Sequence, residues 1–194
     1  MKLRKIRAAA LGALSLVCVG APAAHAAVTV LGNNIAHNCF EVAEFGGNAR
    51  EGIETCTFAL ENTPLAPNDR AGTYVNRGIL KSRINDLDGA LEDYNRAIAI
   101  DANLGEAYVD RGVVMIIDKR YDDALQDINR GIDLGVSKLQ IAYYNRAVVD
   151  EAKGDVRAAY FDYKKAVEID PTFTLAAENL SHFKVVYKHS DGTN

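Results

Sequence analysis

The chain has 194 residues, 48% of them hydrophobic, and 26 aspartates and glutamates outnumber 22 lysines and arginines, so the formal net charge is −4. This acidic balance makes the protein a poor candidate for binding nucleic acid or an anionic membrane surface. The length and the apolar content are sufficient for one domain with a continuous core.

The first 26 residues have the pattern of a secretory signal peptide. Basic side chains are concentrated in residues 1–7, an apolar run follows over residues 8–20, and Ala24-His25-Ala26 provides small residues at the spacing of a cleavage site. The apolar run is too short for an ordinary membrane-spanning helix. We therefore expect cleavage near Ala26 and a periplasmic or secreted protein that is more acidic still.

Three segments of the remaining chain repeat at a spacing of about 34 residues, which is typical of stacked helical hairpins. They are Tyr74–Asn103, Tyr108–Gly135 and Tyr143–Thr172. Small residues align with small ones and bulky residues with bulky ones, so that two helices approach closely and large side chains fill the space beside them. The aligned sets are Gly78, Gly112 and Ala147; Ala90, Ala124 and Ala159; Ala97, Gly131 and Ala166; and Tyr94, Ile128 and Tyr163.

These segments resemble the tetratricopeptide repeat family, in the bacterial variant that reads Tyr-x-Asn-Arg-Gly, then Ala-x-x-Asp-Tyr-x-x-Ala-Ile, then Asp-Pro. The resemblance covers roughly residues 70–173, and Pro171 stands where the family closes a repeat, whereas Ala102 and Val136 stand there in the two preceding copies. It implies an all-α fold, a right-handed α-solenoid of helical hairpins with a C-terminal capping helix. Together with the export signal, it implies an exported bacterial protein whose function is to bind other proteins.

On this basis we expect five parts in the chain. Amphipathic spacing of Leu175, Leu180 and Phe183 predicts the last helix, and a solenoid needs such a cap with a polar outer face. The parts are a signal peptide over 1–26, an N-terminal extension and degenerate first repeat over 27–66, three repeats over 67–173, a capping helix over 174–187 and a disordered tail over 188–194.

A pair of opposite charges also repeats, with one member on each helix of a hairpin. We interpret it as one partly buried ion pair per repeat that sets the register of the two helices. Binding of an anionic ligand by the arginines is the less favoured alternative. The expected structural ion pairs are Arg77 with Asp93, Arg111 with Asp127, and Arg146 with Asp162.

Two cysteines, Cys39 and Cys56, remain after removal of the signal peptide. An even number of cysteines in an oxidising compartment favours a disulfide. In the register of the degenerate first repeat, Cys39 replaces the repeated arginine and Cys56 lies one residue beyond the place of the aspartate. We therefore expect a cross-link between the same two helices, with two buried thiols as the alternative.

The first helix of each hairpin should form the inner wall of the solenoid, and helical spacing predicts that this wall is unusually apolar. Two accounts of this wall compete. In the first, the groove holds an apolar helix or an extended peptide whose backbone is bound by Asn76 and Asn145. In the second, the groove is filled by the C-terminal helix or by Val28–Leu31. Packing between copies of the chain is a third account. The expected groove residues are Val75, Asn76, Ile79, Val109, Asp110, Val113, Ile116, Ile117, Ile141, Tyr144, Asn145 and Val148.

No catalytic motif emerges from the sequence. The histidines that follow the signal peptide are His37, His182 and His189, and no His, Cys or carboxylate cluster has metal-ligand spacing. Some proteins of the family clamp a terminal carboxylate with lysines and asparagines, but apolar residues occupy those places here. We expect no enzyme, cofactor or metal, but a cell-envelope scaffold that binds a protein or peptide. The alternative is a self-assembling or self-capped structural subunit.

Overall fold

The computed structural model describes residues 3–8 and 24–187. The tail expected over 188–194 and residues 9–23 of the expected signal peptide lie outside the described residues. Within the described ranges we find no helix with the length and apolar character that a membrane crossing requires.

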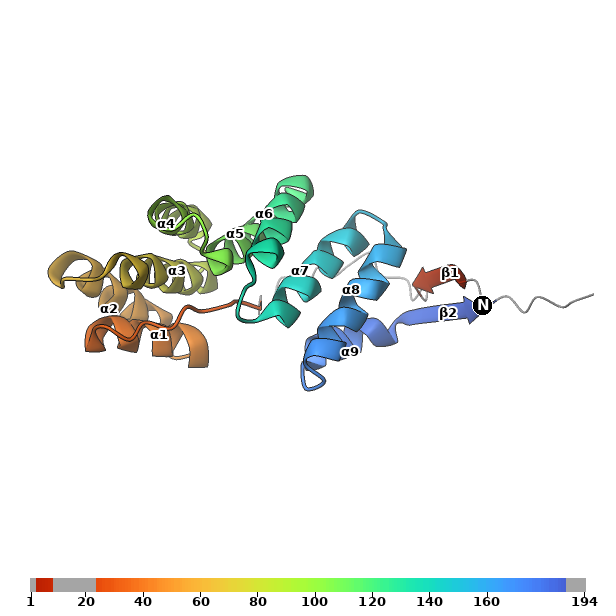
Figure 1. Ribbon diagram of the computed structural model, residues 1–194, viewed down its shortest axis with the longest axis horizontal. Coiled ribbons are helices and arrows are strands. Elements are labelled where there is room, and N and C mark those ends of the chain that lie inside the picture. Colours follow the sequence, from red (N-terminus) through yellow and green to blue (C-terminus); the bar gives the residue numbers. More distant parts are fainter. Residues whose placement is uncertain (1–2, 9–23, 188–194) are drawn as a thin grey trace, which may run out of the picture.

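Nine α-helices occur in the described part of the chain, and consecutive helices pack in antiparallel pairs that follow one another in a row (Figure 1). The all-α solenoid predicted from the repeats is therefore confirmed. The hairpins are α1 with α2, α3 with α4, α5 with α6, and α7 with α8, and α9 packs on α8. The bounds are α1 Asn34–Phe45, α2 Ala49–Asn62, α3 Pro67–Arg83, α4 Leu87–Ile100, α5 Gly105–Ile117, α6 Tyr121–Leu134, α7 Leu139–Ala152, α8 Val156–Ile169 and α9 Thr174–Ser181.

Within each hairpin, a small residue on one helix faces a large residue on the other. A Cβ atom added to Gly78 of α3 would lie 2.6 Å from the ring of Tyr94, which is fully buried in α4. In the next hairpin, a Cβ atom on Gly112 would lie 2.9 Å from Ile128. These close approaches account for the repeated small-and-large pattern of the sequence.

The turn inside each repeat needs one residue in the left-handed region. Asn85, Lys119 and Gly154 occupy this place with φ of 64°, 59° and 84°. Asparagine and glycine adopt this conformation at little cost, but a residue such as lysine is disfavoured there by about 1 kcal/mol. Asp86 and Asp155 then cap the following helices, whereas α6 of the middle repeat has no side-chain cap. The middle turn is thus the least favourable of the three.

The capping helix expected over 174–187 is shorter than predicted and has 8 residues. Helix α9 ends at Ser181, and Phe183–Tyr187 forms the strand β2, which pairs antiparallel with β1, Leu3–Ala8 (Figure 1). The sequence of β2, FKVVY, is rich in β-branched and aromatic residues, which favour strands. The amphipathic spacing therefore overestimated the helix, since the partner strand lies in a distant segment.

Candidate peptide-binding groove

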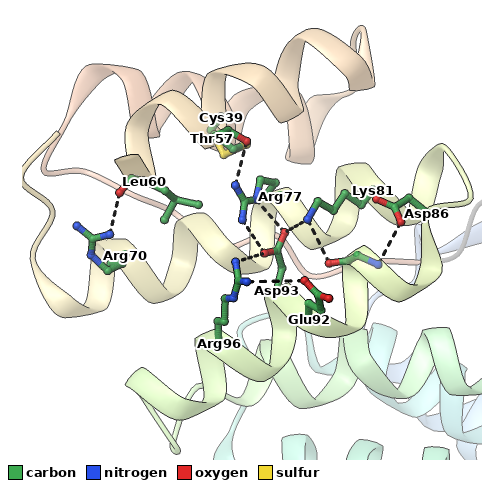
Figure 2. Close-up of polar contacts among 12 residues, drawn as sticks. Cys39, Thr57, Leu60, Arg70, Arg77, Lys81, Asp86, Glu92, Asp93 and Arg96 are labelled. Atoms are coloured by element: carbon green, nitrogen blue, oxygen red, sulfur yellow. Dashed lines mark hydrogen bonds and ion pairs between the residues drawn. A yellow bond between two sulfur atoms is a disulfide. The ribbon is translucent and has the colours of Figure 1, made fainter. Parts of the chain in front are cut away.

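The repeated charge pair does more than join two helices of one hairpin. Arg77 donates from Nε and Nη2 to both carboxylate oxygens of Asp93, over 2.8 and 2.7 Å, and its Nη1 donates to Thr57 Oγ1 over 2.9 Å (Figure 2). Lys81 Nζ also lies 2.8 Å from Asp93, whose side chain is fully buried. Thr57 belongs to α2, so the arginine bonds its own hairpin to the preceding one.

The same geometry recurs in the next two repeats. Arg111 pairs with Asp127 and donates to Asn95 of the preceding hairpin, and Arg146 pairs with Asp162 and donates to Asn129. The hydrogen bond to Asp127 raises the pKa of the Arg111 guanidinium, and that to Asp162 raises the pKa of Arg146. All three nitrogen atoms of each guanidinium donate to a protein partner, and the guanidinium also lies over the ring of the tyrosine three residues earlier. The arginines act as structural links between repeats.

In the first hairpin, a disulfide replaces the charge pair. Cys39 of α1 is bonded to Cys56 of α2, and both side chains are fully buried. The bond joins the two helices at the register where Arg77 and Asp93 join α3 and α4. The terminal hairpin, which has a neighbour on one side only, is thus held by a covalent link.

The inner wall of the solenoid is covered by residues 24–31, which we call the strap. The strap runs outside any helix or sheet, from the start of α1 past α3 toward α5 and α7 (Figure 1). Ala26 and Val30 are fully buried and Ala27 is 7% exposed. Ala27 packs in the cluster that contains Val75 and Ile79. The groove is filled by an N-terminal segment rather than by the C-terminal helix.

Three side chains of the inner wall, one from the equivalent position of each full repeat, bind the strap backbone. Asn76 binds both backbone groups of Val28, accepting from its N–H over 2.9 Å and donating to its carbonyl over 2.8 Å. Asp110 accepts from the N–H of Ala26 over 3.3 Å, and Asn145 donates to the carbonyl of Ala24 over 3.3 Å. Alternate residues of an extended chain point their backbone groups to the same side. The strap therefore runs in the direction opposite to the order of the repeats, and its backbone is hydrogen-bonded at every second residue from Ala24 to Val28.

The ends of the strap are held as well. Ala24 packs against the cluster formed by Tyr144 and its neighbours in α7 and α8. Val30 packs against Ala36 and Ala59 of the first hairpin, and its carbonyl lies 2.9 Å from His37 Nδ1. The strap therefore spans from the third full repeat back to the first hairpin.

The other residues predicted for the groove are mostly buried, but not all of them face it. A Cβ atom on Gly131 of α6 would lie 2.4 Å from Val109, so Val109 packs between α5 and α6. Neighbouring helix residues differ by about 100° in direction, and here Val109 faces α6 while Asp110 faces the strap. Ile116 and Val148 pack in the same cluster as Val109, Val113 and Ile141 are buried, and Ile117 is 44% exposed.

One contact of the strap was missed by the sequence reasoning. A Cβ atom on Gly72 of α3 would lie 2.8 Å from Val28 and 3.2 Å from Val30, so a glycine is needed for the strap to lie this close. Its signal in the sequence is a glycine in the first turns of a helix, where no turn or cap requires one.

Asp110 has an unusual environment. Its side chain is fully buried, and its Oδ1 atom accepts the N–H of Ala26 and lies 3.0 Å from His25 Nδ1. Its other oxygen, Oδ2, has no hydrogen-bond partner in the described part of the chain. Burial raises the pKa of Tyr94, and the charge of Asp110 raises it further. In the described ranges, no group of His, Cys, Asp and Glu side chains could hold a metal ion.

Comparison with known proteins supports the repeat assignment. A family model described as tetratricopeptide repeat matches residues 71–104 and 141–173. The chain folds as a tetratricopeptide-repeat solenoid. No curated protein sequence matches it.

Several solved structures share this fold at low sequence identity, among them domains described as tetratricopeptide repeats. The crystal structure of MamA has a TM-score of 0.59 and 21% identity over 77% of this chain and 82% of that one. The second domain of human RPAP3, solved with the HSP70 peptide SGPTIEEVD, has a TM-score of 0.54 and 22% identity over 60% of this chain and 96% of that one. YrrB, described as a protein with an unusual peptide-binding site, has a TM-score of 0.57 and 25% identity over 66% of this chain and 63% of that one.

Proposed function

We propose that this protein is a non-enzymatic interaction scaffold of the cell envelope that binds an extended protein segment in its concave groove. The observation that supports this most strongly is the strap, because Asn76 binds both the N–H and the carbonyl of one residue, Val28. Paired bonds to the main chain are how proteins recognise extended peptides of variable sequence. The peptide complex of human RPAP3 is a further argument for this function.

Two features favour the envelope. The first 26 residues have the charge and apolar pattern of an export signal. The bond between Cys39 and Cys56 suits an oxidising compartment, since disulfides persist mainly there. Cleavage near Ala26 would remove β1 and the first three residues of the strap. Asp110 and Asn145 would then lose their present partners, while Val28 would stay at Asn76. In this proposal the half of the groove beside α5 and α7 receives the partner.

A self-capped structural subunit is the second candidate, because the strap fills the groove in the full chain. The two functions predict different peptide binding by the chain that begins at Ala27. If the protein is a scaffold, this chain binds extended heptapeptides from an array, and the full chain binds them much more weakly.

Asn145→Ala is the test variant, because Asn145 donates to the carbonyl of Ala24 in the full chain and is left for the peptide backbone in the chain that begins at Ala27, while Asn76 stays intact. Peptide binding should shift the side-chain amide signal of Asn145 in an NMR spectrum, and Asn145→Ala should weaken the binding several-fold. If no peptide binds the chain that begins at Ala27, the self-capped function is correct. If Asn145→Ala leaves the affinity for the peptide unchanged, the partner binds outside this half of the groove.

A further inference from the structure

Asp110 is the one acidic member of the three residues that occupy the same place in successive repeats and bind the strap backbone. Asn76, Asp110 and Asn145 occupy the same register in successive repeats, and each bonds the strap backbone. An amide at each position satisfies a peptide backbone without any charge, as Asn76 does. The carboxylate in the middle repeat therefore adds a property that backbone binding does not require.

The carboxylate of Asp110 is poorly compensated. It is fully buried, and among the described residues the ion pair recorded for it is with His25, a cation only when it is protonated. Arg83 of α3 interacts electrostatically with Asp110, but its guanidinium donates its hydrogen bonds to the carbonyls of Val42 and Ala43 near the end of α1. Because a buried carboxylate is unfavourable without cationic or hydrogen-bond partners, the orphaned Oδ2 atom marks a place for one more donor.

We propose that Asp110 is a charge-selective subsite of the groove, and that its preferred occupant is an extended peptide with a lysine or arginine at the place of His25. The inference rests on the proposed function of the groove. An ammonium carries three donors and a guanidinium five, so either serves both carboxylate oxygens, whereas the imidazole of His25 serves one. The next two places must be small, because Ala26 and Ala27 are enclosed.

The strap competes with any such peptide at high effective concentration, because it is part of the same chain. The test therefore uses the full chain with Ala26→Glu. A carboxylate at this enclosed position beside Asp110 is repelled and has no room, so the strap leaves the groove. Exchange of the Val28 amide, which Asn76 protects, reports this opening. If Ala26→Glu leaves that amide protected, Val30→Glu at the other buried strap position opens the groove instead.

Two labelled heptapeptides serve as probes in fluorescence anisotropy. Both copy residues 24–30, with lysine in one and glutamine in the other at the place of His25. We expect the opened chain to bind the lysine peptide at least tenfold more tightly than the glutamine peptide at low salt. Asp110→Asn in the opened chain should reduce this preference to less than twofold. Asp88→Asn, which removes the same charge from the exposed face of α4, should keep it.

Equal affinity of the opened chain for the two peptides would overturn the subsite, while leaving peptide binding by the groove intact. A preference that survives Asp110→Asn would overturn it as well, because the charge would then be recognised elsewhere. If neither peptide binds an opened chain, both the subsite and the proposed function are wrong.

Discussion

Asn76 holds the strap by two hydrogen bonds to a single residue, so its removal tests the groove directly. The amide donates to the Val28 carbonyl over 2.8 Å and accepts from the Val28 N–H over 2.9 Å. A hydrogen bond of this kind contributes about 1 kcal/mol net. Asn76→Ala should therefore weaken docking of the strap by about 2 kcal/mol, which raises the population of the open state about 30-fold.

Native-state hydrogen exchange measures this opening at the Val28 amide. Amides in α6 and α8 report global unfolding, so the effect on the strap is separated from any loss of overall stability. Asn145→Ala is the matched control, because it removes one longer hydrogen bond, of 3.3 Å, at the far end of the strap. It should accelerate exchange at Val28 much less than Asn76→Ala does.

An unchanged exchange rate at Val28 in Asn76→Ala would refute this reasoning. The strap would then be held by its apolar contacts alone, and backbone recognition by the groove would lose its main support. Equal acceleration by Asn76→Ala and Asn145→Ala would show that the strap opens as one unit and that Asn76 and Asn145 contribute similarly to its docking.

Three further predictions concern stability. Asp93→Ala removes a fully buried carboxylate and leaves the buried Arg77 guanidinium without its ion-pair partner, so it should cost about 3 kcal/mol or more in urea unfolding. Asp162→Ala should cost less because that carboxylate is 13% exposed, and equal losses would contradict the role of burial. Lys119→Gly should raise the free energy of unfolding by about 1 kcal/mol, since it relieves the left-handed backbone of the middle turn; an unchanged melting temperature would count against this. Burial, reinforced by the charge of Asp162, raises the pKa of Asp150 from 3.8 to about 6. Between these values the folded chain binds more protons than the unfolded one, so its stability falls as pH rises through this window. Asp150→Asn should flatten that slope in thermal melts, and an unaltered pH profile would contradict the assignment.

Much of the fold could be read from the sequence because the repeat reports each contact three times. Gly78 against Tyr94 recurs as Gly112 against Ile128, and such a pattern has few packing solutions. The hydrogen bond from each arginine to the preceding hairpin was not predicted. It has a signal in the sequence, because its acceptors Thr57, Asn95 and Asn129 each lie two residues after the place of the aspartate. Each of these bonds connects two successive repeats, so it is not visible when the residues of a single repeat are considered alone.

The strand β2 could not be predicted from local pattern alone. Residues 183–187 suit an amphipathic helix by spacing and a strand by composition, and the balance is decided by a partner strand that lies about 180 residues away. Wherever a segment is ambiguous by itself, the contact that stabilises it determines its structure.

The sequence by itself determined the hairpin repeat, its register and the polar row of Asn76, Asp110 and Asn145, since all of these follow from short-range periodicity. Only the tertiary structure decided what lies against that row. The stacking of the hairpins brings residues 24–28 beside side chains that are 48 to 121 residues away in the chain. Which segment occupies a groove depends on the free energies of all candidates that can reach it, and that comparison exists only once the solenoid has formed.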